Sequence, residues 1–321
     1  MNRRFFSPDS FWNTPIPADA QADANSDRYI DLLAAEPEPN PWLSLTNWTI
    51  PVYEVDDATP LRTMHRLKRG SWKDAELAHG VSFENPVPIP DHAVPDPEAD
   101  SHIAFVDYRK RIAWDMFLAR RRDDGEWESL TAMKYSLDGD GVFDPAELPA
   151  EPGESIHRYG PGRAAGVPII AGLVMHHEVA AGRIDHKLAF ACRVNGYMNY
   201  VWPAMSTDGH LESGPPEGCV LQLDPSIDID SLGLSDGAKV VARALQEYGA
   251  VNVDVAGGTV IYCEGLYGQP DRSWDGLLSH TDLRGLDIRH FRILTCENVQ
   301  HGGKSFTPEE MEKRHYAVGH R

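Results

Sequence analysis

Two kinds of segment are missing from this chain of 321 residues. No apolar run approaches the roughly 20 residues that a membrane-spanning helix needs. The N-terminal stretch MNRRFFSPDSFWN contains no apolar segment typical of a signal peptide. These absences predict a cytoplasmic protein with no membrane partner. Secretion is the alternative if a leader was removed from the chain.

Positive charge is scarce. The chain has 30 lysine and arginine residues against 49 aspartate and glutamate residues, so its formal net charge is −19. Phosphate backbones repel such a surface, and nucleic acid is therefore not expected as a partner. Walker and GxGxxG motifs are also absent. The sequence therefore has no fingerprint of a nucleotide-binding enzyme.

Cysteine is rare as well. The four cysteines lie far apart, each inside an apolar strand-like run, at Cys192, Cys219, Cys263 and Cys296. Because no CxxC pair occurs, a structural zinc site of that type is not expected. We expect buried free thiols, with one or two disulfides as the alternative.

Short strand patterns separated by turn residues are abundant. Segments such as HIAFVDY, RIAWDMFLAR, KLAFACRV and AVNVDVAG follow one another from Ser101 on. Helical patterns with a serine N-cap occur at 26–36 and 235–249, and a charged helix is expected from Thr307. The segment 47–55 predicts an edge strand, because Pro51 interrupts it.

These patterns predict a mainly β fold, an antiparallel β-sandwich or jelly roll with a few short helices. We expect a single domain over residues 1–321. Its N-terminal region, 1–99, is rich in proline and is predicted to be irregular.

Titratable residues lie beside aromatic residues on one predicted strand pair. Asp100 and His102 alternate along the first strand, and Asp115 lies mid-strand next to Trp114 in the second. An apolar wall raises the pKa of a carboxyl group, and an aromatic ring can stack on a sugar. The alternative is that Asp115 faces solvent while Trp114 faces the core, which strand alternation permits.

Later strands repeat this combination of polar and aromatic residues. Asn252 and Asp254 share one face by period two, and Glu264 lies on the next strand. Tyr200 and Trp202 alternate before a polar turn, which suits sugar stacking or, alternatively, a hydrophobic core.

A third group of titratable residues lies between two apolar runs in the segment 163–204. His186 precedes the run KLAFA and could act as a base near neutral pH. A histidine bonded to a loop carbonyl is the alternative. His177, Glu178 and His186 fit no standard metal signature, so no metal site is assigned.

The segment 136–147 partly matches an EF-hand loop. A serine stands at the first position, where such loops carry aspartate, and a polar turn is the alternative. The acidic residues that would bind calcium are Asp138, Asp140, Asp144 and Glu147. No other cofactor is expected.

Motifs along most of the chain resemble an uncharacterised, often secreted, family of bacterial proteins. The matching residues are Ser10 to Pro17 (SFWN-x-PIP), Asp100 to Asp107 (DSH), Trp114–Asp115, Ala164 to Leu173, Gly182 to Phe190 (G-x-I-x-HKLAF), Tyr200 to Ala204, Gly218 to Ser226 and Ala244 to Asp254 (ALQ-x-YG). The resemblance implies no reaction. It implies that Asp100, His102, Asp115, His186 and Asp254 recur together in one shared site.

We therefore expect a carbohydrate-active enzyme, a glycoside hydrolase that cleaves a poly- or oligosaccharide with Asp115 and Asp254 as its carboxylate pair. The other expected catalytic residues are His186, His102 and Asp100. The expected substrate-binding residues are Trp114, Tyr200, Trp202, Asn252 and Glu264. One alternative is a polysaccharide lyase with a histidine or tyrosine base. The other is a non-catalytic carbohydrate-binding or structural protein.

Overall fold

The computed structural model describes residues 3–67, 85–143 and 161–301, and the statements below concern these residues. The α-helices are α1 (Ser26–Ala34), α2 (His176–Ala181) and α3 (Asp236–Glu247). The strands are β1 (Trp42–Ser44), β2 (Ile50–Glu54), β3 (Leu61–Arg62), β4 (Met64–Arg66), β5 (Val87–Pro88), β6 (Ile103–Asp107), β7 (Ile112–Phe117), β8 (Arg120–Arg121), β9 (Trp127–Ser129), β10 (Thr131–Ser136), β11 (Leu188–Cys192), β12 (Asn199–Tyr200), β13 (Val220–Leu223), β14 (Ala250–Val255), β15 (Val260–Tyr262), β16 (Glu264–Gly265), β17 (Phe291–Ile293) and β18 (Gln300–His301).

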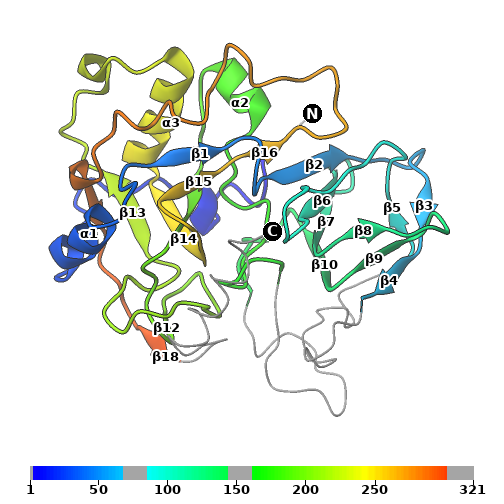
Figure 1. The fold of residues 1–321 in the computed structure, drawn as a ribbon, viewed down its shortest axis with the longest axis horizontal. Coiled ribbons are helices and arrows are strands. Elements are labelled where there is room, and N and C mark those ends of the chain that lie inside the picture. Colours follow the sequence, from blue (N-terminus) through cyan, green and yellow to red (C-terminus); the bar gives the residue numbers. More distant parts are fainter. Residues whose placement is uncertain (1–2, 68–84, 144–160, 302–321) are drawn as a thin grey trace.

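Two sheets lie side by side and organise the molecule (Figure 1). The larger has the strand order β1-β15-β11-β14-β13-β17, and the smaller has the order β10-β7-β6-β2-β16. Figure 1 places the three helices around the larger sheet, on the left, and β2–β10 on the right. Two pairs of consecutive strands are divided between the sheets. β1 and β15 pair in the larger sheet, and the strands that follow them, β2 and β16, pair in the smaller sheet.

One hydrophobic cluster joins the two sheets. It contains Ile50 and Ala113 from the smaller sheet together with Ala189, Val251 and Val253 from the larger one. Burying apolar surface from both sheets in one cluster stabilises their junction. The prediction of a single domain over residues 1–321 stays a prediction. The two sheets do, however, share this hydrophobic cluster.

The expected mainly β fold is confirmed, although the sheets are mixed. β11 pairs parallel with β14 and antiparallel with β15. β6 pairs parallel with β2 and antiparallel with β7. The purely antiparallel sandwich or jelly roll is therefore not confirmed.

Two helix predictions are confirmed, and one strand prediction needs correction. α1 and α3 lie where the helical patterns place them, and the Ser235 hydroxyl caps α3 by accepting from the Ala238 N–H at 3.2 Å. The serine cap predicted for the first helix is wrong, because Asn25 is the N-cap of α1 and the Ser26 hydroxyl accepts from the Ile293 N–H at 2.9 Å. The edge position predicted from Pro51 is wrong, because β2 lies between β6 and β16. The proline is tolerated because pairing with β6 begins only at Val52.

Some predictions fall outside the described residues. These are the helix from Thr307 and the calcium ligands Asp144 and Glu147. Within the described ranges, no helix has the length and apolar character needed to cross a membrane.

Candidate functional site

A buried loop, residues 161–174, connects the two sheets. The Ala165 N–H donates to the Val253 carbonyl of β14 at 3.1 Å, and the Ile169 N–H donates to Asp115 Oδ2 of β7 at 3.0 Å. Backbone groups in a buried loop need partners, and the Asp115 carboxylate supplies one. The loop also approaches β11 so closely at Gly172 (φ +71°) that an added Cβ would lie 2.5 Å from the Ala189 nitrogen.

Arg163 lies in this loop and is only 3% exposed. Its guanidinium carbon is 3.6 Å from the centroid of the Tyr262 ring, and its Nη2 donates to the Ile169 carbonyl at 3.1 Å. Nε and Nη1 are buried and have no hydrogen-bond partner in the part of the chain that the structure describes. The guanidinium therefore retains unused donors.

Asp115 and Asp254 both lie in the field of Arg163. Burial raises the pKa of Asp115 to about 7, although the N–H groups of Ile169 and Gly162 favour its ionised form. Burial also raises the pKa of Asp254 well above its ordinary value, and the nearby carboxyl groups of Asp208 and Asp100 raise it further. Both groups therefore hold protons at pH values where an exposed aspartate is ionised.

Glu217 adds a shared proton to this group. Burial raises its pKa well above its ordinary value, and a carboxyl–carboxyl hydrogen bond with Asp208 acts in the same direction. One of two carboxyl groups in such contact must be protonated. The Asn195 amide donates to Glu217 Oε1 at 2.9 Å and to the Asp254 carbonyl at 2.6 Å, so it links the two acids.

His102 supplies a neutral imidazole beside the acids. Burial and the charge of Arg163 lower its pKa to about 3, and its Nε2 lies 3.4 Å from the Gly162 carbonyl. A ring that stays uncharged at neutral pH can accept a proton or donate a hydrogen bond, depending on its tautomer.

We call Asp100, His102, Asp115, Arg163, Asp208, Glu217, Asp254 and Tyr262 the Arg163 cluster. The cluster has a buried floor and a partly exposed rim. Asp115, Arg163 and Glu217 are buried, whereas Asp100, Asp208 and Asp254 are half-buried. A molecule from solvent would meet the three rim aspartates first.

A β-bulge helps to place Asp254. In the pairing of β11 with β14, Phe190 lies opposite Asn252, but Ala191 lies opposite Asp254, so Val253 is the extra residue. Bulges reorient side chains and occur often beside active sites.

The structure brings four of the five predicted catalytic residues together. Asp100 raises the pKa of Asp254, and Arg163 acts on His102, Asp115 and Asp254. These electrostatic interactions place all four in the Arg163 cluster.

The fifth predicted catalytic residue, His186, lies elsewhere. Its Nε2 pairs with Glu178 Oε2 at 3.0 Å, and its Nδ1 lies 2.8 Å from the Lys187 carbonyl. It precedes Ala191, the partner of Asp254, by five residues, or about 17 Å along an extended chain. His186 is therefore not part of the cluster.

Trp114 does not belong to the site either. Its side chain packs with Ile103, Met116 and Trp127, whereas Ala113 packs in the cluster between the sheets. Side chains alternate along a strand, so Trp114 lies on the face of β7 opposite to Asp115. The stacking role predicted for Trp114 is not supported.

The other two predicted aromatic residues lie at the surface. Tyr200 is half-buried. Trp202 is 59% exposed, and the centroid of its ring lies 4.7 Å from that of the Phe11 ring in an edge-to-face arrangement. Trp202 lines a cavity of about 380 Å³ together with Phe11, Cys219 and Cys296. All four cysteines are free thiols; Cys192, Cys219 and Cys263 are buried, as expected, whereas Cys296 is half-buried.

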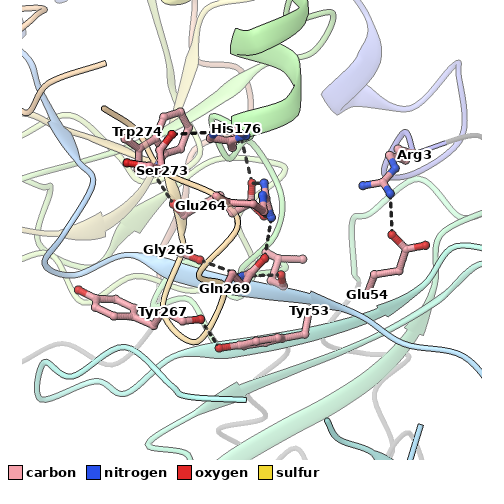
Figure 2. Close-up of polar contacts among 12 residues, drawn as sticks. Arg3, Tyr53, Glu54, His176, Glu264, Gly265, Tyr267, Gln269, Ser273 and Trp274 are labelled. Atoms are coloured by element: carbon pink, nitrogen blue, oxygen red, sulfur yellow. Dashed lines mark hydrogen bonds and ion pairs between the residues drawn. The ribbon is translucent and has the colours of Figure 1, made fainter. Parts of the chain in front are cut away.

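Glu264 is a structural residue in this fold (Figure 2). Arg272 donates to both of its carboxylate oxygens at 2.6 Å, and the His176 N–H donates to Oε2 at 3.0 Å. The Trp274 indole donates to the Glu264 carbonyl at 3.1 Å. Because both carboxylate oxygens are occupied, the predicted role in substrate binding is not supported.

Asn252 also has a structural role. Its amide nitrogen donates to Asn195 Oδ1 at 2.8 Å, and its side chain is fully buried. It holds Asn195 in place, and its amide nitrogen is therefore already engaged within the protein.

Metal ligands are not grouped in the described ranges. No set of three or more histidine, cysteine, aspartate and glutamate side chains there could hold a metal ion. In the loop that resembles an EF-hand, Asp138 pairs with Arg111 at 3.0 Å, and Asp140 accepts from the Val142 N–H.

Sequence reasoning missed Arg163, Asp208, Glu217 and Tyr262 as site residues. Arg163 is a lone charge between a glycine-rich segment and a long apolar run, and Glu217 stands between two prolines and a glycine before β13. Isolated charges bordering apolar segments were the available signal. Tyr262 had no such signal, because it lies in an ordinary apolar strand.

Comparison with known proteins assigns no family. No family model, curated protein or solved structure matches this chain. The family resemblance therefore stays an expectation, and function is argued from the Arg163 cluster.

Proposed function

We propose that the chain is a carbohydrate-active enzyme, a glycoside hydrolase that cleaves a poly- or oligosaccharide at the Arg163 cluster. The observation that carries the proposal is the unequal environment of two carboxyl groups beside one cation. Glycoside hydrolysis needs one carboxyl group as an acid and a second as a nucleophile or base.

Asp254 is suited to the role of general acid. Burial and the neighbouring carboxyl groups of Asp208 and Asp100 raise its pKa, so it keeps its proton at neutral pH. It is half-buried at the rim, where a glycosidic oxygen can approach. Its proton would pass to that oxygen as the bond to the anomeric carbon breaks.

Asp115 is suited to the role of nucleophile or base. Two backbone N–H groups and Arg163 favour its anion, and its pKa of about 7 leaves a substantial ionised fraction near neutral pH. The Ile169 N–H donates to Oδ2 at 3.0 Å, and the Gly162 N–H and the Tyr135 hydroxyl also act on the carboxylate. The Asp115 carboxylate would attack the anomeric carbon or take a proton from water.

A polysaccharide lyase is the second candidate. The neutral His102 ring lies in the field of Arg163, and a lyase needs a base beside a cation that neutralises a uronate carboxylate. His102 would remove the C5 proton, the C4–oxygen bond would break as Asp254 gives its proton to the leaving oxygen, and a C4–C5 double bond would form. His186, which was the expected base, is replaced by His102 in this reaction.

A polysaccharide panel tests these proposals. Reducing ends are measured in parallel with the ultraviolet absorbance of the new double bond. Reducing ends without that absorbance support the hydrolase, and both signals together support the lyase. Binding without either signal would contradict both and leave a non-catalytic carbohydrate-binding protein.

A further inference from the structure

We propose that the sugar unit bound at the Arg163 cluster is a uronic acid, whose carboxylate accepts hydrogen bonds from the Arg163 guanidinium. The inference rests on the proposed function and names its class of substrate. It is carried by the state of Arg163, which is buried and has unused donors.

The guanidinium of Arg163 is held in one orientation. The Tyr262 ring lies against one side of it at 3.6 Å, and the Ile169 carbonyl holds Nη2. These two contacts fix the plane of the group, while Nε and Nη1 have no acceptor in the described residues. A guanidinium with a fixed plane loses little entropy when it binds a planar carboxylate.

The positive charge of Arg163 is only partly compensated within the protein. A buried cation is costly unless an anion or hydrogen-bond acceptors compensate it. Among the described residues no acceptor contacts Nε or Nη1 of Arg163, although Asp115 and Asp254 lie in its field. The ring of Tyr262 supplies only part of the compensation. A bound carboxylate would supply the rest.

The acids around Arg163 suit a ligand that carries a single negative charge. Asp254 and Glu217 have raised pKa values, so each can donate a hydrogen bond instead of repelling an anion. A single cation among several acids matches a singly charged carboxylate better than a phosphate with a greater charge. The rim aspartates would repel the latter more strongly.

Isothermal titration calorimetry tests this with four uronates as probes: D-galacturonate, D-glucuronate, D-mannuronate and L-guluronate. Their neutral parent sugars and inorganic sulfate serve as controls. At least one uronate is expected to bind the wild-type protein, with its neutral parent and sulfate binding about tenfold more weakly or worse. Equal binding of the neutral parent or of sulfate, or no binding of any uronate, would overturn the inference.

Two variants make the test specific. Arg163→Gln is expected to weaken uronate binding by about tenfold or more, and Arg163→Lys by less, because it keeps the charge. Arg122→Gln is the matched control, since Arg122 is a surface residue paired with Asp124. Unchanged uronate affinity in Arg163→Gln would contradict the inference.

A measurement on the wild-type protein covers the case in which Arg163→Gln does not fold. Uronate affinity should fall as pH rises through the range in which Asp115, with its pKa of about 7, becomes ionised. A neutral carboxyl group would then have become a second anion beside the ligand. Uronate affinity that is independent of pH would count against the inference.

Failure of the inference and failure of the proposed function give different results. Turnover of neutral glycans alone would reject the uronate and keep the hydrolase. Arg163-dependent binding of a uronate without turnover of any glycan would keep the uronate site and reject the enzyme.

Discussion

The guanidinium of Arg163 lies 3.6 Å from the centre of the Tyr262 ring, and this contact joins the loop at 161–174 to β15. Through it, one buried cation is fixed beside carboxyl groups from both sheets. The field of Arg163 favours the anions of Asp115 and Asp254 and disfavours a charged His102. Burial is the main cause of the shifted pKa values of these groups, and Arg163 opposes burial for the two acids and reinforces it for His102.

Asp115 should make stability depend on pH. Its pKa is raised from 3.8 to about 7, so the folded protein binds this proton more tightly than the unfolded chain. Its contribution to stability is full below about pH 4 and is lost as pH rises through 7. The free energy of unfolding of wild type minus that of Asp115→Asn, measured in urea, should fall by about 1.4 kcal/mol per pH unit in this window.

His102 should have the opposite effect. Its pKa is lowered from 6.5 to about 3, so its contribution is present above pH 6.5 and is lost as pH falls toward 3. The free energy of unfolding of wild type minus that of His102→Gln should therefore rise with pH over this window. The contributions of Asp115 and His102 change with pH in opposite directions and largely cancel. The pH dependence of wild-type stability alone would therefore reveal neither of them. A difference that does not vary with pH, for either variant, would contradict the described burial.

His186→Gln should change stability and leave turnover intact. Burial alone would lower the pKa of His186, but the Glu178 carboxylate outweighs it, and the pKa is raised. The ion pair therefore stabilises the fold below pH 6.5 and weakens as pH rises through the raised pKa. We expect a loss of about 1–3 kcal/mol at pH 6 and a smaller loss at pH 9. A folded variant with strongly reduced kcat would show instead that His186 takes part in catalysis.

Glu264→Gln should destabilise the protein by about 3 kcal/mol, because it leaves Arg272 without its partner in a largely buried pair. Chemical denaturation gives the value directly. Asp31→Asn is the control, since its ion pair with Arg289 is exposed on both sides and should contribute about 0–1 kcal/mol. Equal effects of the two substitutions would mean that Glu264 does not anchor the loop after β16.

Trp202→Ala should raise KM for a polymeric glycan by about 3- to 10-fold and leave kcat nearly unchanged. The ring is exposed beside a cavity, so its loss removes a stacking surface with little effect on the core. Trp48→Ala is the matched control on another exposed tryptophan. An unchanged KM in Trp202→Ala would remove this surface from the proposed binding site.

Local sequence patterns predicted many of the helices and strands, because a helix cap or the alternation of a strand depends on only a few neighbouring residues. The Ser235 cap of α3 and the strand run containing Asp115 are of this kind. Parallel pairing was not predictable in this way. β2 pairs with β16 across more than 200 residues, so the sequence around Pro51 carries no signal of its second neighbour.

The site was predicted in part, for a similar reason. Asp115 and Asp254 stood out as acids within apolar strands, and the fold brings them to one cation. Arg163 depends on a loop whose contact with Asp115 spans 54 residues. Trp114 was assigned to the site by its proximity in sequence, although alternation turns neighbouring side chains to opposite faces.

The most direct test of the account compares turnover by wild type, Asp115→Asn and Asp254→Asn on the glycan that the wild type cleaves. Folding of each variant is verified by circular dichroism, and product is measured as reducing ends. The account predicts that each substitution lowers kcat by about 10²- to 10⁴-fold. Retained turnover in both folded variants would contradict the central claim that the carboxyl groups beside Arg163 perform the chemistry.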